Sequence, residues 1–331
     1  MQIEVVVNCG AGSVDGAEAD AERQRVVDAF APLGTEPRVA LVVGAALSAA
    51  VSAAAERGAD VVVVAGGDGS LGTAAEALAD SDAEAVLGVL PLGTFNHFAR
   101  DLGIPLDLAD AARAIVEGTT TTIDLADVNG RVFVNNSSIG LYPVMVDLRD
   151  EIRESRGWGK VRAVPLASWR VVRRFPTRRL RISADGERWH LRSPFVFIGN
   201  NRYEVGPKGV GARTSLTDGV LCCFVALVET RWAFARMAVA AVVRGASSTP
   251  TLESVCSDSV EVDAHGHQLL VAVDGEIATL RSPLRYRVRP GALQVRVPAD
   301  AEPPTGPPDA PPAESGVEAD PDREPRTDPD R

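Results

Sequence analysis

The chain has 331 residues, of which 45% are hydrophobic and 24% are charged, and its formal net charge is −11. This is a globular composition, and the length is sufficient for two domains. The charge is uneven, because residues 299–331 contain ten acids and three arginines and leave the rest of the chain at about −4. A nearly neutral body argues against a general nucleic-acid binder, which is usually basic.

The cysteines and the apolar runs indicate a cellular compartment. We interpret the four cysteines, which form no CxxC pair, as small buried apolar side chains in a reducing compartment: Cys9, Cys222, Cys223 and Cys256. The N-terminus lacks the basic and apolar regions of a signal peptide, and the run Val39 to Ala55 is too short and too interrupted to span a membrane. We therefore expect a cytoplasmic protein without a transmembrane segment.

Strand-like and helix-like segments alternate in the first third of the chain. Four apolar runs are each followed by a turn that contains glycine: Ile3–Val7, Val39–Val43, Val61–Ala65 and Val86–Leu90. Unalternated runs of this length are typical of strands buried on both faces of a parallel sheet. Helical stretches lie between and after them: Ala17–Ala31, Ala45–Arg57, Leu71–Ala79 and Leu108–Glu117. The alternation predicts a doubly wound α/β domain over residues 1–124.

The rest of the chain is typical of a different class of domain. Short strands, several of them alternating, are expected at 132–135, 180–184, 189–198, 220–228, 259–262, 269–273, 286–288 and 293–297, with one helix at 232–244. This pattern predicts a mostly antiparallel, β-sandwich-like domain over residues 125–298, whose last strand could return to the first domain. Residues 299–331 contain nine prolines and one large aliphatic side chain, so we expect a disordered acidic tail.

Three glycines surround one aspartate after the third strand, in Gly66-Gly-Asp-Gly-Ser70. Glycine lets the backbone approach a phosphate closely, and the following helix supplies free N–H groups. Asp68 would repel a phosphate unless Mg²⁺ lies between them. A tight turn in which Asp68 caps a helix is the alternative. The chain has no Walker A sequence, and no GxGxxG fingerprint follows the first strand.

A second polar loop, Pro91-Leu-Gly-Thr-Phe-Asn96, follows the fourth strand. Thr94 and Asn96 are short polar groups that could bind phosphate or ribose, or could cap the next helix. Both loops follow strands of one parallel sheet, so we expect them to open at the same edge, where ligands bind.

These loops resemble the diacylglycerol kinase catalytic family, which includes bacterial lipid kinases and sphingosine kinases. The matching segments occur in family order: Asn8–Gly12, Gly66–Ser70, Pro91–Asn96, Asp124, Thr217–Leu221 and Val273–Glu276. The resemblance implies an ATP-binding first domain, a lipid-substrate second domain and an active site in the cleft between them. It also implies phosphorylation of a lipid hydroxyl, with diacylglycerol as the leading acceptor and with ATP and Mg²⁺ as cofactors.

The resemblance also assigns roles to single residues. It implies that ATP phosphates are bound around the glycine-rich loops by Asn8, Gly10, Gly12, Gly66, Gly67, Asp68, Gly69, Ser70, Gly72, Thr94 and Asn96. Asp68 and Asp124 would organise the catalytic Mg²⁺, although a lone acid such as Asp124 is also typical of a turn or cap. Glu276 would accept the proton of the lipid hydroxyl, and Asp274 would orient it or contact Mg²⁺. Asp274-Gly275 is equally typical of a hairpin turn.

A second, structural magnesium site is implied at Ser215–Val220. Asp218 would give its carboxylate, while Ser215 and Val220 would give backbone carbonyls, and such hard oxygen ligands suit Mg²⁺. A surface Asp-Gly turn is the alternative. The chain departs from the family pattern at Asn8-Cys9, at Ser70 and at Gly72-Thr73. A non-catalytic nucleotide or lipid sensor therefore stays open. An NAD kinase-like enzyme is a further alternative, because NAD kinases share the Gly66–Gly69 loop.

Eleven basic residues and three acids lie between Arg149 and Arg181, together with two tryptophans. This stretch could bind anionic headgroups at a membrane surface, or it could be a solvated helical insertion. We expect peripheral binding at the inner face of the membrane and reduced vesicle binding when four arginines become Ser: Arg173, Arg174, Arg178 and Arg179. A homodimer is compatible with the sequence, and no nucleic-acid partner is expected.

Overall fold

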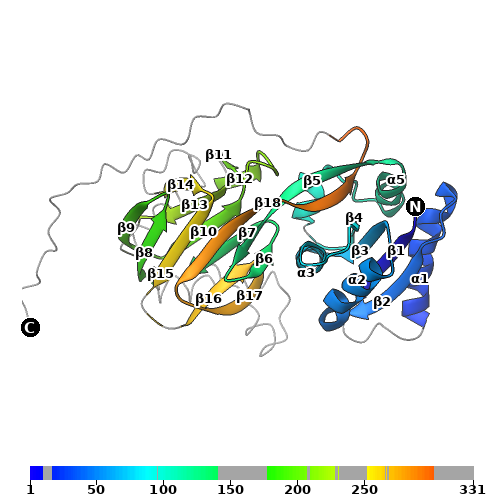
Figure 1. Cartoon of the computed structure of the whole chain (residues 1–331), viewed down its shortest axis with the longest axis horizontal. Coiled ribbons are helices and arrows are strands. Elements are labelled where there is room, and N and C mark those ends of the chain that lie inside the picture. Colours follow the sequence, from blue (N-terminus) through cyan, green and yellow to red (C-terminus); the bar gives the residue numbers. More distant parts are fainter. Residues whose placement is uncertain are drawn as a thin grey trace, which may run out of the picture.

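The computed structural model describes residues 1–9, 17–94, 96–140, 177–206, 209–227, 230, 252–264, 266 and 268–301. These residues form a ten-stranded sheet, a six-stranded sheet and a two-stranded ribbon. Figure 1 shows an α/β lobe and a β lobe side by side, with the helices of the described part gathered in the α/β lobe. The expected helix at 232–244 and most of the tail lie outside the described residues.

The α/β lobe is a parallel sheet covered by helices. Its strands follow the order β2-β1-β3-β4 and have the bounds β1 Ile3–Cys9, β2 Arg38–Val43, β3 Val61–Gly66 and β4 Val86–Pro91. The helices are α1 Ala17–Phe30, α2 Leu47–Glu56, α3 Asp68–Ala79, α4 His97–Asp101 and α5 Leu108–Glu117, with 3₁₀ turns η1 Ala31–Leu33 and η2 Gly44–Ala46. Every residue of β3 is buried, as expected for a strand with helices on both faces.

The β lobe contains two facing sheets. One is antiparallel in the order β14-β13-β10-β7-β16-β17, with β7 Asn136–Gly140, β10 Phe195–Asn200, β13 Leu221–Ala226, β14 Leu252–Ser257, β16 Gln268–Val273 and β17 Glu276–Arg281. The other is the far end of the large sheet, with β5 Thr119–Val128, β6 Arg131–Phe133, β8 Arg178–Ala184, β9 Glu187–Ser193, β15 Ser259–Ala264 and β18 Leu284–Val297. The ribbon pairs β11 Tyr203–Gly206 with β12 Gly209–Arg213. The two-domain fold expected from the sequence, α/β followed by an antiparallel β-sandwich-like domain, is confirmed.

Strand β18 links the two lobes. Its first half pairs with β15 in the β lobe, and Val295 pairs in parallel with Leu87 of β4. It also runs antiparallel to β5 over most of its length, with a register shift between Arg289 and Leu293. Figure 1 shows β18 crossing from one lobe to the other beside β5. The last strand of the described residues therefore returns to the first sheet.

Several element predictions are wrong in detail. The expected strand 189–198 is two strands, β9 and β10, which belong to different sheets and are separated by Pro194. The expected strands 286–288 and 293–297 are one strand, β18, which contains Pro290 and Gly291 at its irregularity. Strand β5 was not expected at all, because Thr119–Thr122 has no apolar alternation. Helix α3 begins at Asp68, three residues earlier than expected.

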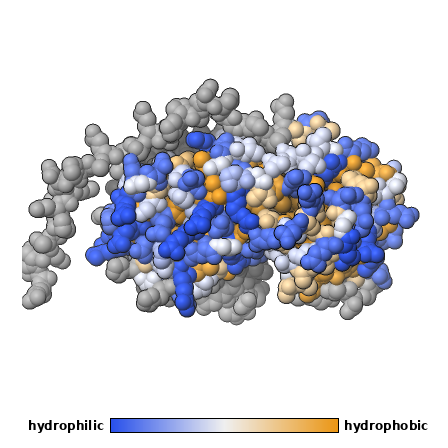
Figure 2. Space-filling model, in the orientation of Figure 1, coloured by the Kyte–Doolittle hydropathy of each residue, from blue (hydrophilic) through white to orange (hydrophobic). Residues whose placement is uncertain are grey.

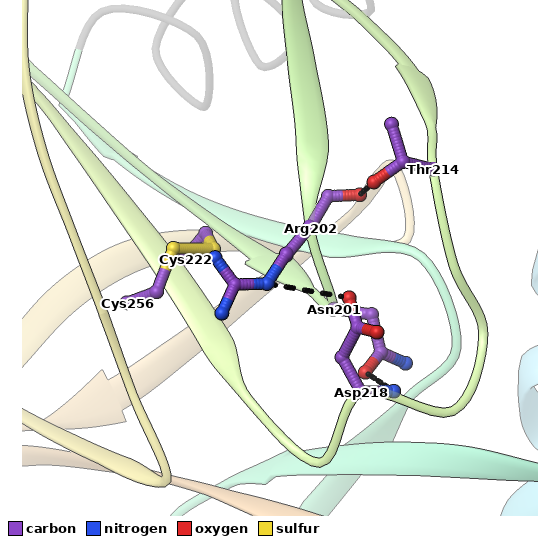
Figure 3. Close-up of a disulfide and its surroundings, with 6 residues drawn as sticks. All are labelled: Asn201, Arg202, Thr214, Asp218, Cys222 and Cys256. Atoms are coloured by element: carbon purple, nitrogen blue, oxygen red, sulfur yellow. Dashed lines mark hydrogen bonds and ion pairs between the residues drawn. A yellow bond between two sulfur atoms is a disulfide. The ribbon is translucent and has the colours of Figure 1, made fainter. Parts of the chain in front are cut away.

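The interpretation of all four cysteines as free thiols is wrong for one pair. Cys222 on β13 and Cys256 on β14 form a disulfide, shown in Figure 3. The two residues lie directly opposite each other in the antiparallel register, with Cα atoms 4.1 Å apart. Cys9 and Cys223 are free, and Cys223 is fully buried as expected.

Candidate functional site

The loops after β3 and β4 lie against each other at the carboxyl edge of the parallel sheet. The Leu92 amide donates a hydrogen bond of 3.0 Å to the Gly66 carbonyl. A Cβ atom on Gly93 would lie only 2.5 Å from the Cα of Gly67. Because no side chain fits between these two backbone segments, their contact requires glycine at position 93. The structure therefore brings the two predicted phosphate-binding loops together.

The end of β1 joins the same edge of the sheet. The Asn8 side chain donates a hydrogen bond of 2.7 Å from Nδ2 to Oγ of Ser70. A Cβ atom on Gly66 would lie 2.7 Å from both Cβ and Oγ of Ser70. Of the residues expected to bind phosphate, Asn8, Gly66 and Ser70 are thus in contact. Gly10 and Gly12 lie outside the described residues.

Asp68 holds the two loops in a fixed relation. It lies in the first turn of α3, and its carboxylate accepts hydrogen bonds from the backbone amides of His97 (3.2 Å) and Phe98 (3.1 Å). Asp68 therefore caps α4, the helix after the second loop, and a negative charge is favourable at that end of a helix. Asp68 is thus a helix cap, as the alternative predicted, but it caps α4 and not α3, the helix in which it lies. Each carboxylate oxygen keeps a further lone pair for another ligand.

Asn96 stabilises the second loop from within. Its φ is 51°, a left-handed conformation that asparagine tolerates. Its Oδ1 accepts from the Gly93 amide and its Nδ2 donates to the Gly93 carbonyl, each at 2.9 Å. The Asn96 side chain is buried and has partners at both ends, whereas Thr94 is exposed at the rim of the loop. Thr94 is therefore the more available of the two for a ligand.

The turn between β16 and β17 carries the two predicted catalytic acids. Asp274 and Gly275 have φ values of 46° and 85°, so the Asp-Gly pair does form the hairpin turn that the alternative predicted. The Asp274 carboxylate accepts three backbone hydrogen bonds, from Val134 (2.7 Å), Asn135 (2.8 Å) and Asn136 (3.0 Å). Burial raises the pKa of Asp274 to about 6, an effect that the three amides and Arg213 only partly offset.

The same turn touches the glycine-rich helix of the other lobe. A Cβ atom on Gly69 would lie 2.6 Å from Oε1 of Glu276, and one on Gly72 would lie 3.2 Å from Oδ2 of Asp274. Gly69 and Gly72 are three residues apart, so they lie on one face of α3. The structure thus places Glu276 and Asp274 directly against the helix that starts at Asp68.

Glu276 remains open to ligands in this arrangement. Its side chain is 55% exposed and forms one ion pair, at 3.1 Å between Oε2 and Nη2 of Arg131. Sequence reasoning missed Arg131, because a single arginine after an Asn-Gly turn has no pattern that separates it from other surface residues. The pair puts one cation beside the predicted proton acceptor.

Asp124 is buried in the middle of β5 and not in a turn. Its carboxylate accepts hydrogen bonds of 2.8 Å from the amides of Gly219 and Gly291, and its exposure is 4%. These contacts place Asp124 beside the loop that contains Asp218, whereas Asp68 contacts α4. Within the part of the chain that the structure describes, no three His, Cys, Asp or Glu side chains cluster as metal ligands. The structure does not bring Asp68 and Asp124 together in such a cluster.

The loop Ser215–Val220 is held by its own backbone and by Asn201. The Ser215 hydroxyl accepts from the Thr217 amide at 3.1 Å. Asn201 accepts from the Asp218 amide at 2.9 Å through Oδ1, and its own amide donates to the Val220 carbonyl at 2.8 Å. The loop is therefore ordered by contacts that leave the Asp218 carboxylate available.

Asp218 has one oxygen that suits a cation. Its Oδ2 is buried and has no hydrogen-bond partner, but it forms an ion pair with Nε of Arg202 at 3.6 Å. Figure 3 draws this ion pair as a dashed line. A buried carboxylate oxygen normally has a partner, and a hard cation would supply one. The backbone carbonyl oxygens of Ser215 and Val220 would be hard ligands of the same kind for the cation. The residues present thus fit Mg²⁺, with Arg202 as a competing positive charge.

Comparison with known proteins defines the class. The diacylglycerol kinase catalytic domain model matches residues 2–128, and the YegS C-terminal NAD kinase beta sandwich-like domain model matches residues 152–297. A Pseudomonas aeruginosa protein described as "Probable lipid kinase YegS-like" is 32% identical over 256 residues, 73% of this chain and 80% of that protein. The chain therefore belongs to the YegS-like lipid kinase family, and it is a kinase.

Two further comparisons concern one segment of the chain and its fold. The diacylglycerol kinase of Bacillus subtilis is 44% identical over 87 residues, which are 26% of this chain and 29% of that protein. A crystal structure of a diacylglycerol kinase from Bacillus anthracis superposes with a TM-score of 0.64 at 19% identity, and the match covers 89% of this chain and 96% of that chain. At this identity the structural match shows the fold alone. Among the described helices, none is long and apolar enough to cross a membrane.

Proposed function

We propose that this protein transfers the γ-phosphate of ATP to the hydroxyl of a membrane lipid, with diacylglycerol as the leading acceptor. The observation that carries the proposal is the contact of Glu276 with Gly69, which joins a candidate proton acceptor to a phosphate-binding helix. The proposal also uses the domain division of the chain: ATP is bound by residues 1–124 and the lipid by residues 125–298, followed by a tail at 299–331.

The first lobe binds the nucleotide in this proposal. Free amides of the glycine-rich loops and the N-terminal end of α3 face the phosphates, because this end of a helix favours negative charge. Asn8, Ser70 and the exposed Thr94 add short polar groups at the same edge. Mg²⁺ held by the remaining lone pairs of Asp68 would neutralise the charge that builds up on the phosphates. Asp68 also holds α4, so one side chain would serve both the fold and the metal.

The second lobe supplies the acceptor side of the reaction. The lipid oxygen attacks the γ-phosphorus, its proton passes to the Glu276 carboxylate, and ADP leaves as the new phosphate monoester forms. Glu276 is suited to this role because it is exposed and lies against Gly69. Asp274 is committed to three backbone amides, so we assign it to positioning the turn. Phosphoryl transfer depends mainly on such positioning and on charge stabilisation.

We further propose that Asp218, with the backbone carbonyls of Ser215 and Val220, binds a structural Mg²⁺. Oδ2 of Asp218, which is buried and accepts no hydrogen bond, supports this role. The site lies in the β lobe, next to the amide of Gly219 that binds Asp124. A cation there would stabilise the junction of the lobes and would take no part in phosphoryl transfer.

A basic face of the β lobe supports docking to the inner face of the membrane. The outward-facing positions of β8 and β9 carry four exposed arginines: Arg179, Arg181, Arg188 and Arg192. Figure 2 shows hydrophilic residues gathered over this part of the molecule. Basic residues near an anionic leaflet contribute about 1 kcal/mol each. The basic stretch before β8 continues toward this face in sequence, but residues 141–176 lie outside the described residues.

Transfer of radiolabelled phosphate from Mg·ATP tests the proposal. Purified protein is assayed against diacylglycerol, ceramide and sphingosine in mixed micelles, and against NAD in solution. Labelled phosphatidic acid is the expected product. Transfer to NAD alone would reject the lipid assignment, and binding of ATP without transfer to any acceptor would favour a sensor. Size-exclusion chromatography of the same preparation decides between a monomer and a homodimer.

A further inference from the structure

A buried arginine lies between the two lobes, outside the residues assigned so far. Arg213 ends β12, and its side chain is only 1% exposed. Its Nε and Nη2 both contact Oδ2 of Asp101, at 2.8 and 2.7 Å. Its Nη1 donates to the Val134 carbonyl at 2.7 Å, and its Nη2 donates to Oδ1 of Asn135 at 3.0 Å. One guanidinium thus joins α4 of the first lobe to the segment 134–136 of the second.

Each partner of Arg213 is one contact away from a predicted catalytic acid. Asp101 is the last residue of α4, and the first two amides of α4 bind the Asp68 carboxylate. The amides of residues 134–136 bind the Asp274 carboxylate. The contacts therefore run without interruption from Asp68 through α4 and Arg213 to Asp274, which is two residues from Glu276.

The segment 134–136 has partners for its backbone on both sides. Its amides go to Asp274, while the Val134 carbonyl accepts from Arg213 and from Nδ2 of Asn200. The Asn135 carbonyl accepts from the Tyr203 hydroxyl at 2.8 Å. Because so many groups converge on it, this segment can pass a displacement of Arg213 directly to the turn that carries Asp274.

The choice of residue fits a geometric role better than a purely stabilising one. A buried ion pair gains little over apolar side chains of similar volume, because both charges lose their hydration. A guanidinium, however, presents several donors in a fixed fork, and here these donors reach three acceptors on two lobes. Lysine has a single flexible ammonium and cannot reproduce that fork.

We infer that Arg213 is a positioning residue for phosphoryl transfer, which keeps the Asp68 loop in register with the Asp274–Glu276 turn. This inference rests on the proposed function of the cleft. Arg213 touches neither reactant in this account, and it acts through Asp101 and the segment 134–136. Loss of the register would separate the proton acceptor from the phosphate without removing either group.

The test uses the full chain with Arg213→Met, Arg213→Lys and the double variant Arg213→Met/Asp101→Leu, which leaves no buried charge unpaired. We expect kcat to fall by about 10²-fold in all three, as for a small misplacement of reacting groups, while KM for ATP stays close to wild type. Arg113→Met is the matched control, because Arg113 forms an exposed ion pair with Asp110 within α5. This control should keep the wild-type kcat.

Two results would overturn the inference. One is a double variant that melts like wild type and keeps the wild-type kcat. The other is a kcat loss that disappears when rates are divided by the folded fraction, which is what a merely structural role predicts. Hydrogen exchange gives a readout that needs no turnover: the amides of His97, Phe98 and residues 134–136 should exchange faster in the double variant at unchanged melting temperature. That readout separates failure of this inference from failure of the kinase proposal.

Discussion

The molecule contains two groups of carboxylates, which differ in the oxygens that they leave open to a ligand. The cleft group, Asp68, Asp274 and Glu276, lies between the lobes, and two of its members bind only backbone amides in the described structure. The junction group, Asp124 and Asp218, lies beside β5 and the loop 215–220. One buried oxygen of this group, Oδ2 of Asp218, accepts no hydrogen bond and is paired with Arg202 at 3.6 Å. The carboxylate that is open to a ligand in the cleft group is Glu276, and it is exposed. The corresponding oxygen in the junction group is Oδ2 of Asp218, and it is buried.

The difference separates chemistry from support. An aspartate that accepts hydrogen bonds from two or three amides holds the backbone in place, because hydrogen bonds to a charged group are stronger than those between neutral groups. Asp68, Asp124 and Asp274 all do this. The oxygens that accept no amide then decide the use of each group. An exposed carboxylate next to a phosphate-binding helix suits proton transfer, and a buried oxygen without a hydrogen bond suits a cation. The cleft group should therefore control turnover, and the junction group should control stability.

The largest effect is expected for Asp68→Asn. The change removes a charge that caps α4 and, in our proposal, holds Mg²⁺ next to the phosphates. We expect kcat to fall about 10³-fold or more, as when a group that stabilises transition-state charge is lost. Initial rates with saturating Mg·ATP and lipid measure this. Asp124→Asn is the comparison. It should lower the melting temperature and leave kcat per folded molecule nearly unchanged.

Gly93→Ala should have the next largest effect. Its Cβ would lie 2.5 Å from the Cα of Gly67, and because the obstacle is backbone, the two loops must move apart. We expect a rise in KM for ATP of about tenfold or more, given the cost of small displacements at a reacting centre. Gly44→Ala is a matched control, since its Cβ would meet only Oδ1 of Asn8 at 4.0 Å. Equal KM values for the two variants would contradict the loop contact.

The pH dependence should report Asp274, whose pKa burial raises to about 6. Below that pH the protonated acid loses acceptor capacity for its three amides, so kcat should rise with pH through about 6. Stability moves in the other direction: the folded state holds this proton longer than the unfolded chain, so the contribution of Asp274 to folding declines as pH rises from about 4 to 6. A kcat–pH profile of Asp274→Asn should lack the limb near pH 6. An unchanged limb in that variant would assign it to another group.

The smallest effect is expected at Asp218. Mg²⁺ bound to the native state raises stability by mass action, so millimolar Mg²⁺ should raise the melting temperature of wild type by a few degrees. Asp218→Asn should abolish this rise and leave kcat per folded molecule nearly unchanged. Thermal unfolding with and without Mg²⁺ measures it. A large kcat loss at constant stability would move Asp218 from the junction group to the chemistry.

Local signals were sufficient for the first lobe and insufficient for the second. Buried runs such as Val61–Ala65 predict their strands because both faces carry the same pattern. Strand β5 and the continuity of β18 depend on long-range pairing, which Thr119–Thr122 and Pro290-Gly291 conceal. The disulfide likewise depends on a register between residues 34 positions apart.

The sequence predicted the loops of the site, but it did not predict which residues contact one another there. Sequence motifs located Gly66–Ser70 and Asp274–Glu276, but only the fold shows that Glu276 lies against Gly69. Arg131 and Arg213 have no sequence signal, since a single arginine at the end of a short strand is usually solvated. Asp124 was grouped with Asp68 through the family resemblance, whereas its carboxylate binds the loops at Gly219 and Gly291.

Comparing Glu276→Gln with wild type tests the central claim most directly, because the claim joins a nucleotide site in one lobe to a proton acceptor in the other. The variant should bind Mg·ATP with wild-type affinity in calorimetry and should lose about 10²–10⁴-fold in kcat for the lipid, as expected for loss of a general base. Wild-type turnover in Glu276→Gln, or loss of Mg·ATP binding together with kcat, would contradict this account of the cleft.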